Sequence, residues 1–233
     1  MDIKVLASGS TGNAYRISDG QTALLLDAGI TIHALQTGCN FQLHKLDGCL
    51  ITHAHKDHSA SAGALARLGI DIYTSKGTID ACGLSGHRIK AVEALKEIEI
   101  GSFKTLPFDV EHDAPEPLGF LLESMATTEK LLYFTDTYYL RYSFRGLTHI
   151  MGECNYDTDS MRQSVEAGYI PVELVPRIVK SHMSLEHFLE FLKANDLSGV
   201  RQIYLLHLSE NNSDAERFKL EVQRQTGAEV YVY

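Results

Sequence analysis

The sequence has few cysteines and no long apolar segment. Its four cysteines are scattered and form no CxxC pair, so we expect reduced thiols. No stretch of eighteen apolar residues is present, which argues against a transmembrane helix and a membrane-bound role. Residues 1–6 are predicted to form a strand and not a signal peptide. These features together predict a cytoplasmic protein.

An excess of positive charge is also lacking. The chain carries 21 Lys and Arg against 30 Asp and Glu, a formal net charge of −9. This balance argues against tight non-specific binding of duplex nucleic acid. It does not exclude a nucleic-acid substrate, because cations cluster locally at Arg141 and Arg145 and at Arg177 and Lys180.

No low-complexity linker and no repeat divides the chain. Its 233 residues, 44% of them hydrophobic, suffice for one large core, and we predict a single domain over residues 1–233. Short apolar runs alternate with helical patterns, which favours an α/β protein with mixed sheets and helices outside. Strands are predicted at 3–6, 14–18, 22–26, 48–51, 71–74, 97–100, 104–110, 118–123, 130–135, 148–153, 202–206 and 229–233, and helices at 31–37, 58–68, 77–83, 157–168, 173–179, 184–194 and 213–226.

The most informative segment is the HAHKDH hexapeptide at residues 53–58. It follows the apolar run at 49–51 and precedes a helical pattern, so it lies at a strand-to-helix turn. His53 and His55 are two residues apart and point the same way in extended chain. Asp57 and His58 lie past the turn and can reach a second point. Imidazoles and carboxylates suit zinc, iron or manganese, so this segment predicts the start of two adjacent metal sites.

Further metal-type ligands end other predicted strands. His112, Asp136 and His207 each follow a short segment rich in branched or aromatic residues. The combined pattern HxHxDH…H…D…H resembles the metallo-β-lactamase superfamily. LASGSTGN, LLLDAG, THAHKDH, EHDAPEPLGF and FTDT, together with the HMS around His182, resemble its YycJ/WalJ-like branch, whose members are described as 5′-to-3′ exodeoxyribonucleases.

The resemblance implies a four-layer αββα sandwich and a hydrolase with two divalent ions per chain. Zinc or manganese is expected, and iron is compatible. One ion would be held by His53, His55 and His112, and the other by Asp57, His58 and His207. Asp136 would bridge the two ions, because a carboxylate can span two cations. Asp57 and His182 are the predicted catalytic residues.

Two loops are candidates for substrate contact. The SGSTGN loop at 8–13 offers hydroxyls and an amide, at Ser8, Ser10, Thr11 and Asn13. Such a loop can hold an anion or simply turn a hairpin. His182 precedes Ser184, the predicted N-cap of a helix, where a phosphate is favoured. The resemblance implies that His182 contacts a phosphate or protonates the leaving oxygen.

Two acidic residues, Asp27 and Glu153, lie at the ends of predicted strands. Asp27 ends an apolar run, where a carboxylate is costly unless it has a partner. We predict that it orients a ligand histidine or the hexapeptide turn. Glu153 and Asn155 line the pocket or cap the next helix.

Tyr156 stands where relatives have histidine, so no family role is carried over there. His33, His44, His87, His149 and His187 have no convergent partners in the sequence.

The sequence thus predicts a metal-dependent phosphodiester hydrolase that acts on DNA ends. A small-molecule phosphodiesterase for cyclic nucleotides is the alternative, followed by a thioester or lactam hydrolase of the same fold. A non-enzymatic, metal-stabilised module is disfavoured because no ligand is missing. Metal identity, polarity of degradation and oligomeric state are left open by the sequence.

Overall fold

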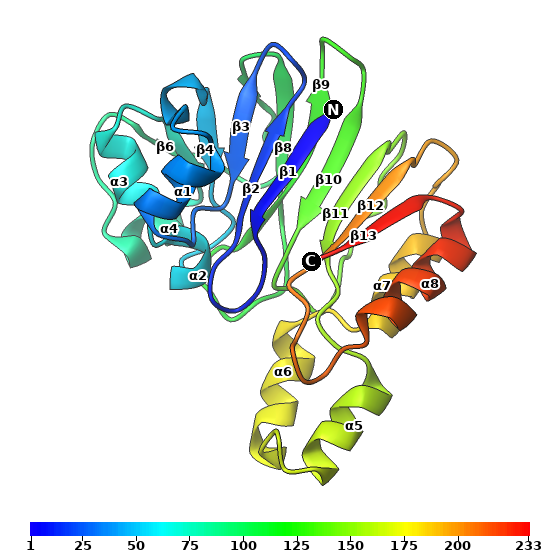
Figure 1. Cartoon of the computed structure of the whole chain (residues 1–233). Helices are drawn as coiled ribbons and strands as arrows, with labels where there is room; N and C mark the ends of the chain where they lie inside the picture. Colours follow the sequence, from blue (N-terminus) through cyan, green and yellow to red (C-terminus); the bar gives the residue numbers. More distant parts are fainter. The chain divides into compact units, whose positions relative to one another are not determined.

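The computed structural model describes residues 1–233 and divides into two compact units (Figure 1). The first unit comprises residues 1–109 and 114–129, and the second comprises residues 110–113 and 130–233. No helix in the chain is both long enough and apolar enough to cross a membrane.

The first unit contains a six-stranded sheet in the order β1-β2-β3-β4-β5-β6. Its first three strands pair antiparallel and the rest pair parallel. The short strands β3 and β4 are buried along their whole length, as expected for parallel strands covered on both faces. The strand bounds are β1 Asp2–Ala7, β2 Ala14–Ser18, β3 Ala23–Leu26, β4 Gly48–Leu50, β5 Ile72–Thr74 and β6 Ile89–Ala91.

Helices of the first unit lie against this sheet (Figure 1). They are α1 Ile32–Gly38, α2 Lys56–Ser59, α3 Ala62–Arg67 and α4 Lys76–Cys82, with a 3₁₀ turn at Leu43–Lys45. Thr31 and Ser75 accept hydrogen bonds from backbone N–H groups of α1 and α4, which fixes where these helices begin. Leu35 and Leu65 pack with strand residues such as Ile72 of β5 in one apolar cluster.

Three antiparallel strands complete the first unit: β7 Ile98–Ile100, β8 Phe103–Asp109 and β9 Leu118–Ser124. Asp19, in the β2–β3 turn, ties them to the rest of the unit. Its Oδ2 accepts hydrogen bonds from Ser102 Oγ at 2.5 Å and Ser124 Oγ at 2.6 Å. A single carboxylate thus joins the β2–β3 turn to the β7–β8 turn and to the end of β9.

The second unit contains four parallel strands in the order β10-β11-β12-β13. Helices α7 and α8 lie beside β12 and β13, and α5 and α6 extend together away from the strands (Figure 1). Because the strands are parallel, their carboxyl ends meet at one edge. The element bounds are β10 Lys130–Phe134, β11 His149–Glu153, β12 Gln202–Leu206, β13 Glu229–Val232, α5 Thr158–Glu166, α6 Val175–Ser181, α7 Leu185–Lys193 and α8 Ala215–Thr226, with a 3₁₀ turn at Val172–Leu174.

Close packing of α7 on the strands depends on Gly152. The rings of Phe134 and Phe188 are 6.0 Å apart. A Cβ on Gly152 would lie 2.4 Å from Phe134 and 2.8 Å from Phe188. The edge of the sheet next to Glu153 is therefore held by a glycine that lets two aromatic rings approach the backbone.

Most predicted elements are present, with four differences, the first of which is the unpredicted 3₁₀ turn at Leu43–Lys45. The predicted helix at 58–68 is two short helices, α2 and α3, with a break at Ala60 and Ser61. The predicted helix at 173–179 begins as a 3₁₀ turn and continues as α6, which has Pro176 in its first turn. Strand β6 was not predicted, because a strand of three residues carries too little pattern.

Candidate metal centre

The hexapeptide of the first unit gathers three imidazoles at the turn from β4 to α2. His55 is the N-cap residue of α2. The ring of His53 is centred 4.2 Å from that of His58 and 4.8 Å from that of His55. Asp57 Oδ2 lies 3.4 Å from His58 Nε2. His53 and His58 are almost completely buried.

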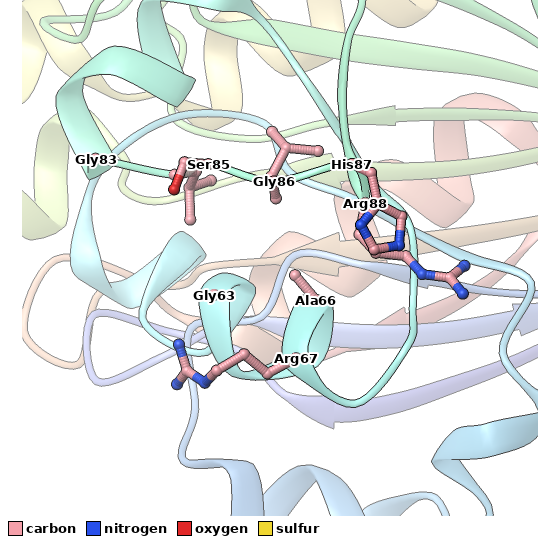
Figure 2. Close-up of a pocket in the computed structure, with 10 residues that line it drawn as sticks. Gly63, Ala66, Arg67, Gly83, Ser85, Gly86, His87 and Arg88 are labelled. Atoms are coloured by element: carbon pink, nitrogen blue, oxygen red, sulfur yellow. The ribbon is translucent and has the colours of Figure 1, made fainter.

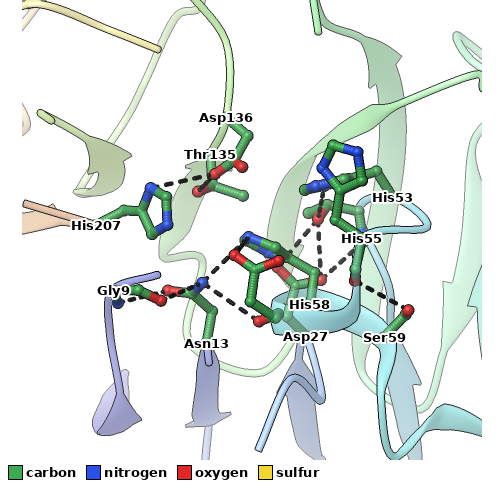
Figure 3. Close-up of polar contacts among 12 residues, drawn as sticks. Gly9, Asn13, Asp27, His53, His55, His58, Ser59, Thr135, Asp136 and His207 are labelled. Carbon is green, nitrogen blue, oxygen red and sulfur yellow. Dashed lines mark hydrogen bonds and ion pairs between the residues drawn. The ribbon is translucent and has the colours of Figure 1, made fainter. Parts of the chain in front are cut away.

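Asp27 supports this turn from the end of β3 (Figure 3). Its fully buried carboxylate lies 2.8 Å from His58 Nδ1 and accepts hydrogen bonds from the backbone N–H and hydroxyl of Thr52, at 2.8 and 3.0 Å. An acceptor at Nδ1 places the proton there and leaves Nε2 as the donor atom for a metal. The orienting role of Asp27 stays a prediction.

Asn13 holds the same turn from the β1–β2 loop. Its backbone N–H donates to Asp57 O at 2.7 Å, and its side-chain amide lies 3.0 Å from Gly9 O and 3.1 Å from His58 Nε2. The side chain is fully buried, so its contacts lie within the protein. Among the other loop residues predicted to bind substrate, Ser8 is half-buried and accepts from the Tyr15 hydroxyl, whereas Ser10 and Thr11 are exposed.

Gly29 allows the hexapeptide turn to approach β3. A Cβ at this position would lie 1.6 Å from Asp57 O and 2.8 Å from His58 N. The backbone of Ala28, next to it, donates to His58 O at 2.7 Å. No side chain fits here, which explains the glycine of LLLDAG in structural terms.

In the second unit, ligand-type residues cluster at the carboxyl ends of three neighbouring strands. Asp136 follows β10, Glu153 ends β11 and His207 follows β12. His182 joins them from the end of α6. Each of these four residues offers one ligand atom, and those atoms lie within 4.8 Å of one another. His112 belongs to the same unit, and its Nε2 lies 3.6 Å from Asp136 Oδ2.

Glu153 organises this cluster and is the residue whose role the sequence did not settle. Its fully buried Oε1 lies 2.6 Å from His182 Nδ1 and 3.1 Å from His207 Nδ1, and its Oε2 accepts from the backbone N–H groups of Thr137 and Met183. One carboxylate thus fixes two imidazoles through the same ring position. The available sequence signal was its place at a strand end, which helix capping explained equally well.

The Glu153 carboxylate and the His182 imidazole each stabilise the charged form of the other. Burial raises the pKa of Glu153, but the charge of His182 and the hydrogen bonds from both imidazoles outweigh burial, so this pKa is lowered. Burial opposes the charged form of His182, but the Glu153 carboxylate outweighs it and raises the pKa of His182. The side chain of His182 is 23% exposed. His182 is therefore a partly accessible, readily protonated imidazole.

The donor chemistry of both units fits divalent metal ions. The first unit offers His53, His55, Asp57 and His58, and the second offers His112, Asp136 and His207. Imidazoles and carboxylates form the set that zinc, manganese and iron accept. His58 and His207 also have a buried carboxylate at Nδ1. No such set is formed by His33, His44, His87, His149 or His187.

Comparison with known proteins identifies the family of the chain. The β-lactamase superfamily domain matches residues 22–208. The exodeoxyribonuclease WalJ of Streptococcus pneumoniae strain D39 is 31% identical over 227 residues, covering 91% of this chain and 83% of its own length. The exodeoxyribonuclease YycJ of Bacillus anthracis is 28% identical over 242 residues, covering 96% of this chain and 88% of its own length.

A solved structure shows the fold. The metallo-β-lactamase fold protein YhfI of Bacillus subtilis superposes with a TM-score of 0.73 at 17% identity, over 99% of this chain and 95% of that one. The predicted fold is thereby confirmed. The chain belongs to the metallo-β-lactamase superfamily, in its YycJ/WalJ-like branch, and is a metal-dependent hydrolase.

Proposed function

We propose that the protein hydrolyses phosphodiester bonds of DNA as a 5′-to-3′ exodeoxyribonuclease. The similarity to two proteins named exodeoxyribonucleases extends over most of the chain. The observation that carries the proposal is the Glu153–His182 pair, at 2.6 Å, in the same cluster as Asp136 and His207. A protonated imidazole beside metal-type ligands suits a phosphate, which gains negative charge during the reaction.

We further propose that the ligands of both units serve two divalent ions. His53, His55 and His112 would hold one ion, Asp57, His58 and His207 would hold the other, and Asp136 would bridge them. This assignment rests on the order of ligands in the sequence and on family membership. Two such ions lower the pKa of water towards about 7 and stabilise charge on phosphoryl oxygens.

The supporting residues of this chain then have distinct roles. Asp27 orients His58, and Glu153 orients His207 and His182, in each case through Nδ1. His182 holds a proton at Nε2. From there it binds a phosphate oxygen or protonates the departing 3′ oxygen. Glu153 keeps this proton in place, because its carboxylate stabilises the imidazolium.

The test measures hydrolysis of several substrates by one preparation of the purified protein, in the presence of Mn²⁺ or Zn²⁺. These are single- and double-stranded DNA labelled at either end, RNA, a cyclic nucleotide, bis(p-nitrophenyl) phosphate and a thioester. We expect release of nucleotides from the 5′ end of DNA. Cleavage of the cyclic nucleotide alone would favour the small-molecule phosphodiesterase. The net charge of −9 fits a small substrate better than it fits DNA, which is a polyanion. Efficient thioester cleavage without phosphodiester cleavage would refute the proposal.

A further inference from the structure

A groove in the first unit lies outside the candidate metal centre. It is a cavity of about 360 Å³ between α3 and the segment that links α4 to β6. Figure 2 shows Gly63, Ala66 and Arg67 on α3 facing the segment from Gly83 to Arg88. The volume is within the range of small-ligand sites. No residue with a carboxylate is among the ten that line the groove.

The polar lining of the groove is basic although the chain is acidic. Arg67 and Arg88 flank opposite ends of the groove, and His87 lies next to Arg88 (Figure 2). Arg67 and His87 are exposed, and Arg88 is half-buried. Asp71 Oδ1 accepts from Arg88 Nη1 at 3.0 Å, which holds this guanidinium in place and leaves it further N–H donors. A chain with a net charge of −9 thus lines this groove with two arginines and a histidine, and of these Arg88 forms an ion pair with Asp71.

In the segment from Gly83 to Arg88, a ligand can approach the backbone closely. Gly83 and Gly86 have φ values of 61° and 112°, and a Cβ at either position would meet nothing within 4 Å. The glycines are present for conformation, and they leave open space over the backbone. Opposite them, a Cβ on Gly63 would stand 3.6 Å from both Arg67 Nη1 and Leu84. A larger side chain at position 63 would therefore occupy the groove.

The groove is joined to the hexapeptide of the metal centre by two connections. Gly63 lies five residues after His58, so the chain allows at most about 18 Å between their Cα atoms. Cys82, just before Gly83, places its Sγ 3.6 Å from Ala54 O and 3.4 Å from Ser59 Oγ. The linking segment is thus anchored on the turn that carries the predicted metal ligands.

We propose that this groove binds the phosphate backbone of single-stranded DNA a few nucleotides from the scissile bond. The inference rests on the proposed function, because it assigns part of the DNA to a place beside the same site. Arginines contact phosphates through several N–H groups at once. A flexible single strand can follow a short groove of this kind.

The test measures binding of a phosphorothioate oligo(dT) that resists hydrolysis, with the metal-loaded protein, from low to moderate salt. Arg67→Gln is the charge variant, and Gly63→Leu fills the groove without changing charge. Arg224→Gln, at an exposed position in the last turn of α8, is the matched control. We expect Arg67→Gln to weaken binding about two- to fivefold. The slope of log affinity against log salt should fall in magnitude by about 0.7, the value for one phosphate of a single strand.

Gly63→Leu should also weaken binding, and Arg224→Gln should not. All variants should hydrolyse bis(p-nitrophenyl) phosphate at the rate of the parent protein, because that substrate is too small to reach the groove. Unchanged affinity and salt slope in both groove variants, with DNA cleavage intact, would overturn the groove assignment alone. A parent protein that cleaves no phosphodiester would instead overturn the proposed function.

Discussion

Glu153 Oε1 lies 2.6 Å from His182 Nδ1, and this contact joins a fully buried carboxylate to a partly exposed imidazole. The same oxygen lies 3.1 Å from His207 Nδ1. Glu153 therefore links the residue proposed to act on the substrate to a residue proposed to bind metal. A change at Glu153 should affect both residues, and a change at His182 should affect only one.

Replacement of His182 by alanine should leave the metal content and the fold intact. If His182 protonates the leaving oxygen, the catalytic rate on DNA should fall by roughly 10²–10⁴-fold. The rate on bis(p-nitrophenyl) phosphate should fall much less, since its leaving group needs little protonation. Steady-state kinetics on both substrates, with metal analysis of the variant, check this. Equal losses would assign phosphate binding to His182 instead, and metal loss would make it a ligand.

Replacement of Glu153 by glutamine should lower kcat on DNA more than His182→Ala does. The amide keeps the size of the side chain but removes the charge that holds both Nδ1–H groups. We expect weaker metal binding as well, by about 10–100-fold, as for other residues that orient metal ligands. Metal titration and DNA kinetics measure the two effects. A Glu153→Gln protein with normal kinetics and normal metal affinity would refute the linking role.

Replacement of Gly29 by alanine should destabilise the first unit and its metal site together. The added Cβ would overlap Asp57 O, so the hexapeptide turn must move. Overpacking of this kind costs about 1–3 kcal/mol of unfolding free energy. Denaturant unfolding with and without metal measures the cost. Gly63→Ala is the control, because its Cβ would meet nothing closer than 3.6 Å; equal stability of both variants contradicts the close-approach argument.

Asp19 should make stability depend on pH in the acid range. Burial raises its pKa, but hydrogen bonds from Ser102, Ser124 and the turn backbone outweigh burial and lower it from 3.8 to about 2. A lowered pKa in the folded state means that the stabilisation is complete above about pH 4 and is lost as pH falls towards 2. Unfolding of the parent and of Asp19→Asn between pH 2 and 7 checks this. The two proteins should differ most at neutral pH, and a constant difference would contradict the assignment.

The sequence predicts most of the elements and names the candidate metal ligands from local patterns. The hexapeptide is contiguous, and Asp136 and His207 each follow an apolar strand. The role of Glu153 was not local. It follows from the parallel register that pairs Glu153 with Leu206 and so brings it next to His207. Strand pairing over this separation leaves no mark in a single sequence.

The position of Asn13 shows a similar limit. Its loop looks like a substrate-binding segment because of its glycines and hydroxyls. In the structure, Asn13 binds Gly9 O and Asp57 O, and only Ser10 and Thr11 of the predicted contacts are exposed. A polar residue that closes a turn and one that binds a ligand have the same composition. Only the long-range contact with residue 57 separates them.

Asp136 offers the sharpest single substitution at the metal centre. Asp136→Ala removes the only carboxylate proposed to contact both ions. The variant should therefore retain at most one tightly bound ion and lose nearly all activity on DNA and on bis(p-nitrophenyl) phosphate. Elemental analysis and kinetics test this, with Asp113→Ala, an exposed neighbour of His112, as a control. Retention of two ions by Asp136→Ala would remove it from the bridging position.

The central claim is a two-metal hydrolase that acts on DNA, and metal titration of the metal-free protein tests it most directly. Bound Mn²⁺ or Zn²⁺ per chain is measured alongside the rate of nucleotide release from the 5′ end of labelled DNA. The account predicts that activity rises only as the second ion binds and reaches its maximum at two ions per chain. Full activity at one ion per chain would contradict it.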